Sequence, residues 1–310
     1  MDKNSLNQEI SHLFDDVSPA QAWDTAEDII CCLNPAYDFG HLRMVFDDVV
    51  DLFQGRFPGY CEIRAPYHNL NHTLDVFMCT VRMMHGVQVA GEARFEDDCI
   101  SQLCIAAMLH DVGYAQRKGE ASGTGAQFTQ SHIERGIEFV RHYLTERELP
   151  AHWPEALSCM IRSTSLQQQF SDIAFPDAKA RLAGKILGSS DLVGQMASRN
   201  YIEKLLLLYL EFKEARFGEY GSMYELLHKT QDFYRHILTL LDQDFDNVYS
   251  HLSCHFQEYL GNTRNYYRES IDRNIAYLAR VLSLDEDCYL SMLKRDGIVQ
   301  QALRQSGVAA

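Results

Sequence analysis

Apolar residues recur along most of this chain at the spacing i, i+3, i+4 and i+7, which places them on one face of an α-helix. The pattern is clearest over residues 22–33, 42–53, 99–110, 132–144, 201–215 and 270–282. Convincing strand patterns, in which apolar and polar residues alternate, are absent from the sequence. The pattern therefore predicts an all-α protein.

Breaks in the helical pattern are few. Pro66, Pro150, Pro154 and Pro176 stand where a helix should begin or end, and residues 115–129 form a soft segment rich in Gly, Ser and Thr. No internal repeat is visible. We expect one compact all-α domain, with an N-terminal helical segment over 1–60, a core over 61–240 and a C-terminal helical extension over 241–310.

Charge and composition narrow the function classes. The formal net charge of −15 argues against nucleic acid or an anionic membrane as a partner, because phosphate neutralisation requires clustered Lys and Arg. No apolar run reaches the roughly 18 residues of a membrane span, and the acidic N-terminus is unlike a secretory signal. Nine cysteines include no CxxC pair. A reduced, cytoplasmic setting is expected.

The first candidate site is the stretch APYHNLNHTLDV, residues 65–76. A helix beginning near Pro66 would align His68, His72 and Asp75 on one stripe, because residues three and four apart are neighbours on a helix surface. The buried side would then consist of Val76, Phe77, Val81 and Met84. Taken alone, two such histidines more often form an ordinary hydrogen-bonded feature.

A second stretch, CIAAMLHDVGY at 104–114, strengthens the case for a metal. An apolar helical run leads into His110 and Asp111, and burying a carboxylate there costs several kcal/mol unless it is paired or bound to a metal. We expect Gly113 to let the chain leave the helix sharply. The plainer alternative is an aspartate that caps a loop.

A third stretch, at 178–196, places Asp191 after another apolar helical run, among the small residues Ser189, Ser190 and Gly194. By itself Ser-Ser-Asp is a common helix cap. Together with the other two stretches it completes a set of His, His-Asp and Asp. Mixed nitrogen and oxygen ligands of this kind suit borderline or hard divalent ions.

In that order, His72, His110-Asp111 and Asp191 resemble the metal-binding motif of the HD superfamily of metal-dependent phosphohydrolases. The stretch YHNLNHTLDV is similar to the YHNxxHAxDV motif of class I cyclic-nucleotide phosphodiesterases, matched at Tyr67, His68, Asn69, His72, Asp75 and Val76. The resemblance reaches from about residue 60 to 215. It implies a multi-helix bundle of the HD-domain and phosphodiesterase type.

The resemblance also implies a role for each residue. His72, His110, Asp111 and Asp191 would hold a first metal ion, Asp111 would bridge to a second, and His68 would be the general acid that protonates the leaving alkoxide. The chemistry agrees, because two divalent ions about 3.5–4 Å apart can hold a bridging hydroxide as nucleophile. The ions would be Mn, Mg, Zn or Fe. Asp75 would orient the ligand side chains or position metal-bound water without binding the metal itself.

Three departures separate this chain from the phosphodiesterases. Those enzymes carry another His and then Pro-Gly shortly after the HD pair, where this chain has Tyr114. No counterpart of their base-reading glutamine is evident near the C-terminus, and the spacing from His110 to Asp191 is short. The departures place cyclic AMP and cyclic GMP in doubt as substrates, although the metal site is little affected.

The segment TQSHIERGIEFV, at 129–140, admits two registers. Many two-metal HD enzymes place a second-metal ligand at the start of the next helix, and His132 fits that role. The phosphodiesterase pattern is instead Ser-x-x-Glu, met by Ser131 and Glu134, with the glutamate holding metal-bound water. We favour His132, and the two roles can coexist. In the plainest alternative Ser131 caps a solvated helix, and Glu134 interacts with its dipole.

Other candidates are weaker. Arg117 and Lys118 could meet a substrate phosphate, but a solvated loop is the more ordinary explanation for them. The remaining histidines, including His85, His142, His152 and His255, lack partners at useful spacing and are expected to be ordinary. The apolar run around 205–212 is expected to be core.

These observations predict a hydrolase that cuts a phosphoester in a small, nucleotide-like substrate. Two alternatives stay open: an HD-type scaffold that senses a metal or ligand without turnover, and a di-iron HD-type oxygenase. Because His68 accompanies all four metal ligands, the hydrolase is preferred; a sensor need not keep a proton donor. Apolar helices near the C-terminus would also allow a homodimer.

Overall fold

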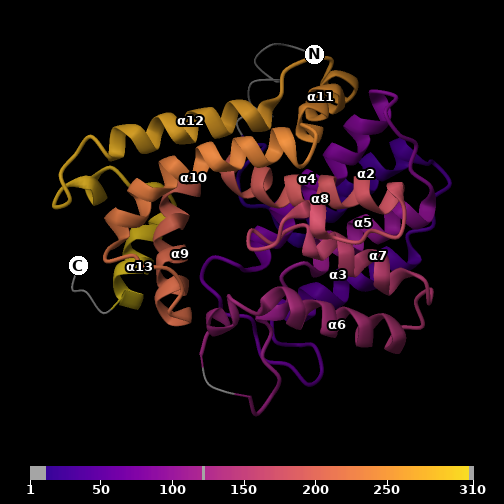
Figure 1. Ribbon diagram of the computed structural model, residues 1–310, viewed down its shortest axis with the longest axis horizontal. Coiled ribbons are helices and arrows are strands. Elements are labelled where there is room, and N and C mark those ends of the chain that lie inside the picture. Colours follow the sequence, from indigo (N-terminus) through magenta and orange to yellow (C-terminus); the bar gives the residue numbers. More distant parts are fainter. Residues whose placement is uncertain (1–11, 121–122, 307–310) are drawn as a thin grey trace.

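The computed structural model describes residues 12–120 and 123–306, which form an all-helical protein (Figure 1). Within these residues there is no β-strand; an isolated antiparallel bridge joins Tyr60 to Arg117. The all-α prediction is confirmed. The α-helices of the described residues are α2 (Pro19–Leu33), α3 (Gly40–Phe53), α4 (Leu70–Val89), α5 (Asp97–Leu109), α6 (His132–Glu146), α7 (Trp153–Arg162), α8 (Ala178–Ala197), α9 (Tyr201–Ala215), α10 (Met223–Gln243), α11 (Leu252–Leu260), α12 (Tyr266–Val281) and α13 (Ile298–Ser306).

Helices α4 and α8 pack against each other at the centre of the fold. Fourteen of the twenty residues of α4 are buried, as are thirteen of the twenty residues of α8. Such helices have little polar face, because other helices surround them on most sides. Helices α2, α5 and α11 cover α4, whereas α7 and α12 cover α8. The expected buried side of α4 is confirmed: Val76, Phe77, Val81 and Met84 are fully buried.

A second group of helices, formed by α9, α10, α12 and α13, lies on the left of Figure 1. Helix α9 packs against the other three, and α12 reaches across to α8. One continuous hydrophobic core extends from Ala22 to Ala302. The division at residues 60 and 240 stays a prediction, and residues 1–11 of the first segment lie outside the described part. No helix in the described residues combines the length and apolar character needed to cross a membrane.

Candidate metal centre

Four side chains predicted from the sequence to bind a metal converge at the meeting point of α4, α5 and α8. His72 Nε2 lies 3.2 Å from His110 Nε2 and 3.2 Å from Asp111 Oδ2. Asp191 Oδ1 lies 3.3 Å from His72 Nε2 and 3.7 Å from His110 Nε2. Within the described residues, His72, His110 and Asp111 form a three-residue group whose geometry could hold a metal ion.

The hydrogen bonds of this cluster leave its lone pairs directed inward. His110 Nδ1 lies 2.8 Å from the carbonyl oxygen of Ala107 and donates to it, so the lone pair of its Nε2 faces the other ligands. Asp111 Oδ2 is buried and makes no hydrogen bond of normal geometry in the described part of the chain, although it lies 3.2 Å from both His72 Nε2 and His110 Nε2. A buried carboxylate oxygen without a partner is costly. A divalent cation would satisfy it, so these residues fit a metal.

The histidines and carboxylates of the cluster stabilise each other's charged forms. Burial alone would lower the pKa of His72, but the neighbouring Asp111 and Asp191 carboxylates raise it to about 10. Burial would raise the pKa of Asp111, but His110 and the other histidines around it hold it well below its usual range. The aspartate is therefore anionic at neutral pH, as a metal ligand must be.

His132 lies at the edge of this cluster. Its Nδ1 donates to the carbonyl oxygen of Thr129 over 2.7 Å, and its Nε2 lies 3.7 Å from Asp111 Oδ1. That distance is too long for a direct hydrogen bond but leaves room for an ion between the two atoms. The Asp111 carboxylate therefore faces the His72 and His110 nitrogens with one oxygen and His132 with the other.

Gly113 makes this approach of His132 possible. It lies in the 3-10 turn η1 (Val112–Tyr114), and a Cβ atom there would fall 1.8 Å from the carbonyl oxygen of His132. The expectation that Gly113 provides a helix exit was wrong: its φ is not positive, and the glycine is required by close packing between η1 and α6. Arg135 ties the same two elements together, since it donates to the carbonyl oxygens of Gly113 and Ala115.

Glu134 points away from the cluster. Its side chain is 67% exposed and accepts two hydrogen bonds from Arg162, each 3.1 Å long. Of the two candidates in this segment, the His132 side chain therefore faces the cluster, whereas the Glu134 side chain lies at the surface. Ser131 is the N-cap residue of α6 but makes no side-chain capping bond.

His68 lies beside the cluster but not on the helix that carries His72. The expected helix start near Pro66 was wrong, because α4 begins at Leu70 and the Asn69 side chain caps it by accepting from the amides of Asn71 and His72. His68 precedes this cap. Its orientation comes instead from Glu211 on α9, whose Oε2 lies 2.5 Å from His68 Nδ1.

Glu211 is the site residue that sequence reasoning missed. Its side chain is fully buried, and its second oxygen accepts from the backbone amides of Tyr67 and His68. Burial alone would lower the pKa of His68, but the Glu211 and Asp111 carboxylates raise it above its ordinary value. A charged residue inside the apolar run at 205–212 was the available signal, since a buried carboxylate requires a partner.

Asp191 is supported through a second set of contacts. The Tyr67 hydroxyl donates to Gln195 Oε1 over 2.5 Å. The amide nitrogen of Gln195 then donates to the Asp191 carbonyl oxygen and, at 3.4 Å, to its Oδ1. Outer contacts of this kind orient metal ligands.

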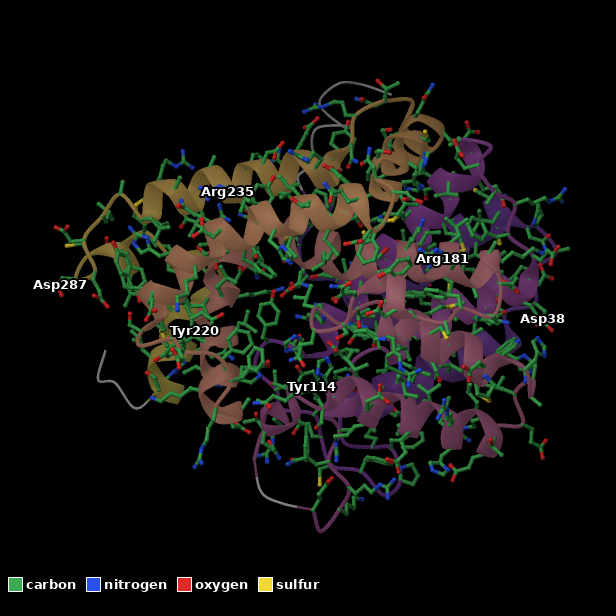
Figure 2. All side chains as sticks on the ribbon, viewed as in Figure 1. Asp38, Tyr114, Arg181, Tyr220, Arg235 and Asp287 are labelled. Atoms are coloured by element: carbon green, nitrogen blue, oxygen red, sulfur yellow. The ribbon has the colours of Figure 1, made fainter. Side chains whose placement is uncertain are left out.

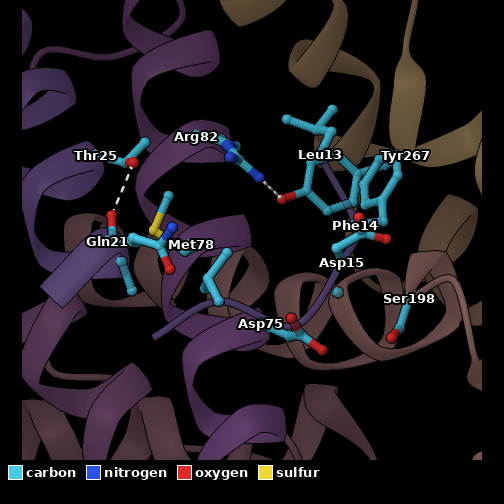
Figure 3. Close-up of a pocket in the computed structure, with 13 residues that line it drawn as sticks. Leu13, Phe14, Asp15, Gln21, Thr25, Asp75, Met78, Arg82, Ser198 and Tyr267 are labelled. Atoms are coloured by element: carbon cyan, nitrogen blue, oxygen red, sulfur yellow. Dashed lines mark hydrogen bonds between the residues drawn. The ribbon is translucent and has the colours of Figure 1, made fainter. Parts of the chain in front are cut away.

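Asp75 faces a different part of the molecule. It lines a pocket with Arg82, Ser198 and Tyr267 that contains none of the metal-site residues (Figure 3). Its Oδ2 lies 3.8 Å from Lys204 Nζ. Burial raises the pKa of Asp75 to about 6, although Lys204 lowers it. In the described part of the chain, no hydrogen bond or ion pair joins Asp75 to a cluster residue, although the charge of His72 also lowers the pKa of Asp75.

Arg117 and Lys118 lie on the surface beyond η1. Arg117 is 63% exposed and lies 4.0 Å from Glu138, and Lys118 is exposed. The glycine-rich segment continues through residues 121–122, which lie outside the described residues. The structure does not bring these two cations to the cluster.

Tyr114, the residue at which this chain departs from the phosphodiesterase motif, packs against two site histidines. Its ring centroid lies 4.8 Å from that of His68 and 4.7 Å from that of His132, with nearly parallel planes in both pairs. Burial, together with the Asp111 and Glu211 charges, raises the pKa of Tyr114 well above its usual value. The phenol is therefore neutral.

The chain matches no protein-family model, no curated protein and no solved structure among those compared with it. The chemistry of this centre therefore has to be inferred from its residues.

Proposed function

We propose that the protein is a metal-dependent phosphohydrolase that cuts a phosphoester in a small, nucleotide-like substrate. One observation carries the proposal: a histidine bonded to a buried glutamate lies beside a convergent set of two histidines and two aspartates. Binding a metal does not require the first pair. Hydrolysis does, because a leaving oxygen has to be protonated.

The donor set favours divalent ions. His72, His110, Asp111 and Asp191 would hold one ion, and Asp111 and His132 would hold a second. When bound, such ions activate water as a nucleophile and neutralise the charge on the phosphoryl oxygens. A buried ligand whose ring is fixed by a hydrogen bond, such as His110, needs little rearrangement to bind them.

His68 is the proposed proton donor. Because Nδ1 contacts Glu211, Nε2 is the nitrogen that a substrate can reach. The Glu211 carboxylate holds the ring in place and stabilises its protonated form, so a proton is available at neutral pH for the leaving oxygen. Transfer of that proton leaves a neutral imidazole that still donates from Nδ1 to Glu211.

The same pair favours the hydrolase over the two alternatives. A sensor that only binds a metal has no use for a buried carboxylate that keeps a histidine protonated. An oxygenase needs open metal positions, and nothing about the His68–Glu211 pair serves that need. The nine cysteines are all free, which supports the cytoplasm as the proposed location. A homodimer stays a prediction.

The test is a panel of cyclic, dinucleotide and monophosphate esters assayed with Mn²⁺, with metal content measured on the same samples. We expect His68→Ala to keep its metal and to lose about 10²–10⁴-fold in kcat. His152→Ala is the matched control, because His152 is exposed and its ion pair is with Asp98, away from the cluster. The proposal fails if the wild type hydrolyses none of these esters, or if His68→Ala is as active as the control.

A further inference from the structure

The hydroxyl group of Tyr114 is a buried donor that makes no hydrogen bond of normal geometry to a described residue. The residue is 1% exposed. Leaving a buried hydroxyl unpaired costs on the order of 1–3 kcal/mol. Native proteins rarely leave such a group unpaired unless a ligand or water completes it.

Two buried polar atoms of this site make no hydrogen bond of normal geometry to a described residue, and they differ in chemistry. Asp111 Oδ2 is an acceptor, and Tyr114 Oη carries a proton. A metal ion satisfies a carboxylate oxygen but cannot satisfy an O–H donor, which needs an acceptor. Filling the metal positions would therefore complete Asp111 and leave Tyr114 incomplete. A bound group that offers an oxygen would complete the tyrosine.

Tyr114 is well placed to contact such a group. The centroids of its ring and of the His68 and His132 rings form a triangle with sides of 4.8, 4.7 and 6.3 Å. One corner is the proposed proton donor and another is the proposed ligand of the second ion. Figure 2 shows Tyr114 near the middle of the molecule, between α6 and α9.

Among the described residues, the Thr129 side chain competes for the role of acceptor. A hydrogen-bond interaction with it lowers the pKa of Tyr114 against the effect of burial. Its own hydroxyl donates to the carbonyl oxygen of Ala126 over 2.7 Å, and no hydrogen bond of normal geometry links it to Tyr114. A variant at Thr129 therefore separates a protein partner from a bound one.

We infer that Tyr114 donates a hydrogen bond to a non-bridging oxygen of the phosphoryl group, and that its ring holds the rings of His68 and His132 in position by stacking between them. The inference rests on the proposed function for the identity of the ligand. A neutral donor directed at developing negative charge stabilises the transition state more than the ground state. Tyr114 would then be a catalytic residue in addition to His68.

Two substitutions separate the hydroxyl from the ring. Tyr114→Phe removes only the hydroxyl, so we expect unchanged Mn²⁺ content, a kcat lower by roughly 10–10³-fold, and about tenfold weaker binding of inorganic phosphate to the Mn²⁺-loaded protein. Tyr114→Leu removes the ring as well, so we expect the second ion to be lost too. Calorimetric titration with phosphate and elemental analysis provide the two readouts that do not depend on turnover.

Thr129→Val is the control for a protein partner and should keep wild-type phosphate affinity. The inference is overturned if Tyr114→Phe keeps wild-type kcat and phosphate affinity, or if Thr129→Val loses as much as Tyr114→Phe. A wild type that binds Mn²⁺ and phosphate but hydrolyses no ester rejects the hydrolase, while the phosphate titration still decides the role of Tyr114. A wild type that binds no Mn²⁺ rejects both.

Discussion

Helix α4 carries two buried histidines, and each faces a second buried histidine in a different surrounding. His72 Nε2 lies 3.2 Å from His110 Nε2, and His85 Nδ1 lies 3.1 Å from His255 Nδ1. The nitrogen–nitrogen geometry is nearly the same. Around the first pair, Asp111 and Asp191 raise the pKa of His72 to about 10. Around the second, burial followed by the Arg82 charge lowers the pKa of His255 to about 2.

The difference lies in the carboxylates rather than in the histidines. Two neutral imidazoles can share one N–H···N hydrogen bond, which accounts for the His85–His255 pair without any ligand. The His72–His110 pair has two aspartates around it, and Asp111 Oδ2 lies 3.2 Å from the Nε2 atoms of both histidines. The geometry of the His72–His110 pair therefore favours binding of a cation, whereas the surroundings of the His85–His255 pair keep both imidazoles neutral.

The largest effect is expected from removing the charge of Asp111. Asp111→Asn should abolish metal binding at both positions and lower activity by on the order of 10³-fold or more, because this carboxylate faces both ligand groups. His85→Gln, which changes the other buried pair on the same helix, should keep full metal content. Elemental analysis of both proteins checks the contrast. Equal metal content in the two variants would show that the carboxylate does not distinguish the pairs.

A smaller effect is expected at Glu211, which holds the proton donor but binds no metal. Glu211→Gln should keep the metal and lower kcat by roughly 10–10²-fold, since a neutral amide stabilises the protonated His68 ring less well. Glu214→Gln is the matched control, one turn further along α9, where the carboxylate contacts Thr124. If Glu211→Gln loses its metal, Glu211 supports the cluster itself and not the proton donor.

Next is the close contact between η1 and α6. Gly113→Ala should lower the free energy of unfolding by about 1–3 kcal/mol through overpacking and should release the second ion by displacing His132. Gly136→Ala is the control, because a Cβ there meets its nearest neighbour at 3.4 Å. Urea denaturation and metal content test both effects. A Gly113→Ala protein that keeps two ions would separate His132 from the second metal.

The smallest effect concerns pH and the second histidine pair. Because the pKa of His255 is about 2 in the folded protein and about 6.5 in an unfolded chain, only the unfolded chain binds this proton between those values. Stability should therefore decline as the pH falls below 6.5, with a contribution from this residue of up to about 1.4 kcal/mol per pH unit. His255→Gln should decline less steeply between pH 6.5 and 4.5. Equal slopes would contradict the buried neutral pair.

Much of this architecture could be predicted from local patterns. The 3.6-residue periodicity indicated α5 and α6, because an amphipathic helix leaves its period in the chain itself. His110, Asp111 and Asp191 were within reach because a histidine or carboxylate at the end of an apolar run is anomalous in its own segment, whereas His72 was indicated by its spacing from His68 and by the motif it resembles. The structure brings these four together.

What escaped prediction depends on contacts distant in the chain. Glu211 meets His68 across 143 positions, and no local pattern indicates such a pairing. The His85–His255 pair, 170 positions apart, escaped for the same reason, and His85 and His255 were expected to be ordinary. The start of α4 was misplaced because Pro66 is a familiar helix-initiating residue, whereas the Asn69 cap sets the boundary through two backbone amides.

The most direct test of the central claim is anomalous X-ray diffraction from crystals soaked in Mn²⁺. We expect two peaks about 3.5–4 Å apart, one among His72, His110, Asp111 and Asp191 and the other between Asp111 and His132, with none at His85–His255. A cluster without any peak at saturating Mn²⁺ would contradict the account. Occupancy at His85–His255 in preference to the cluster would contradict it equally.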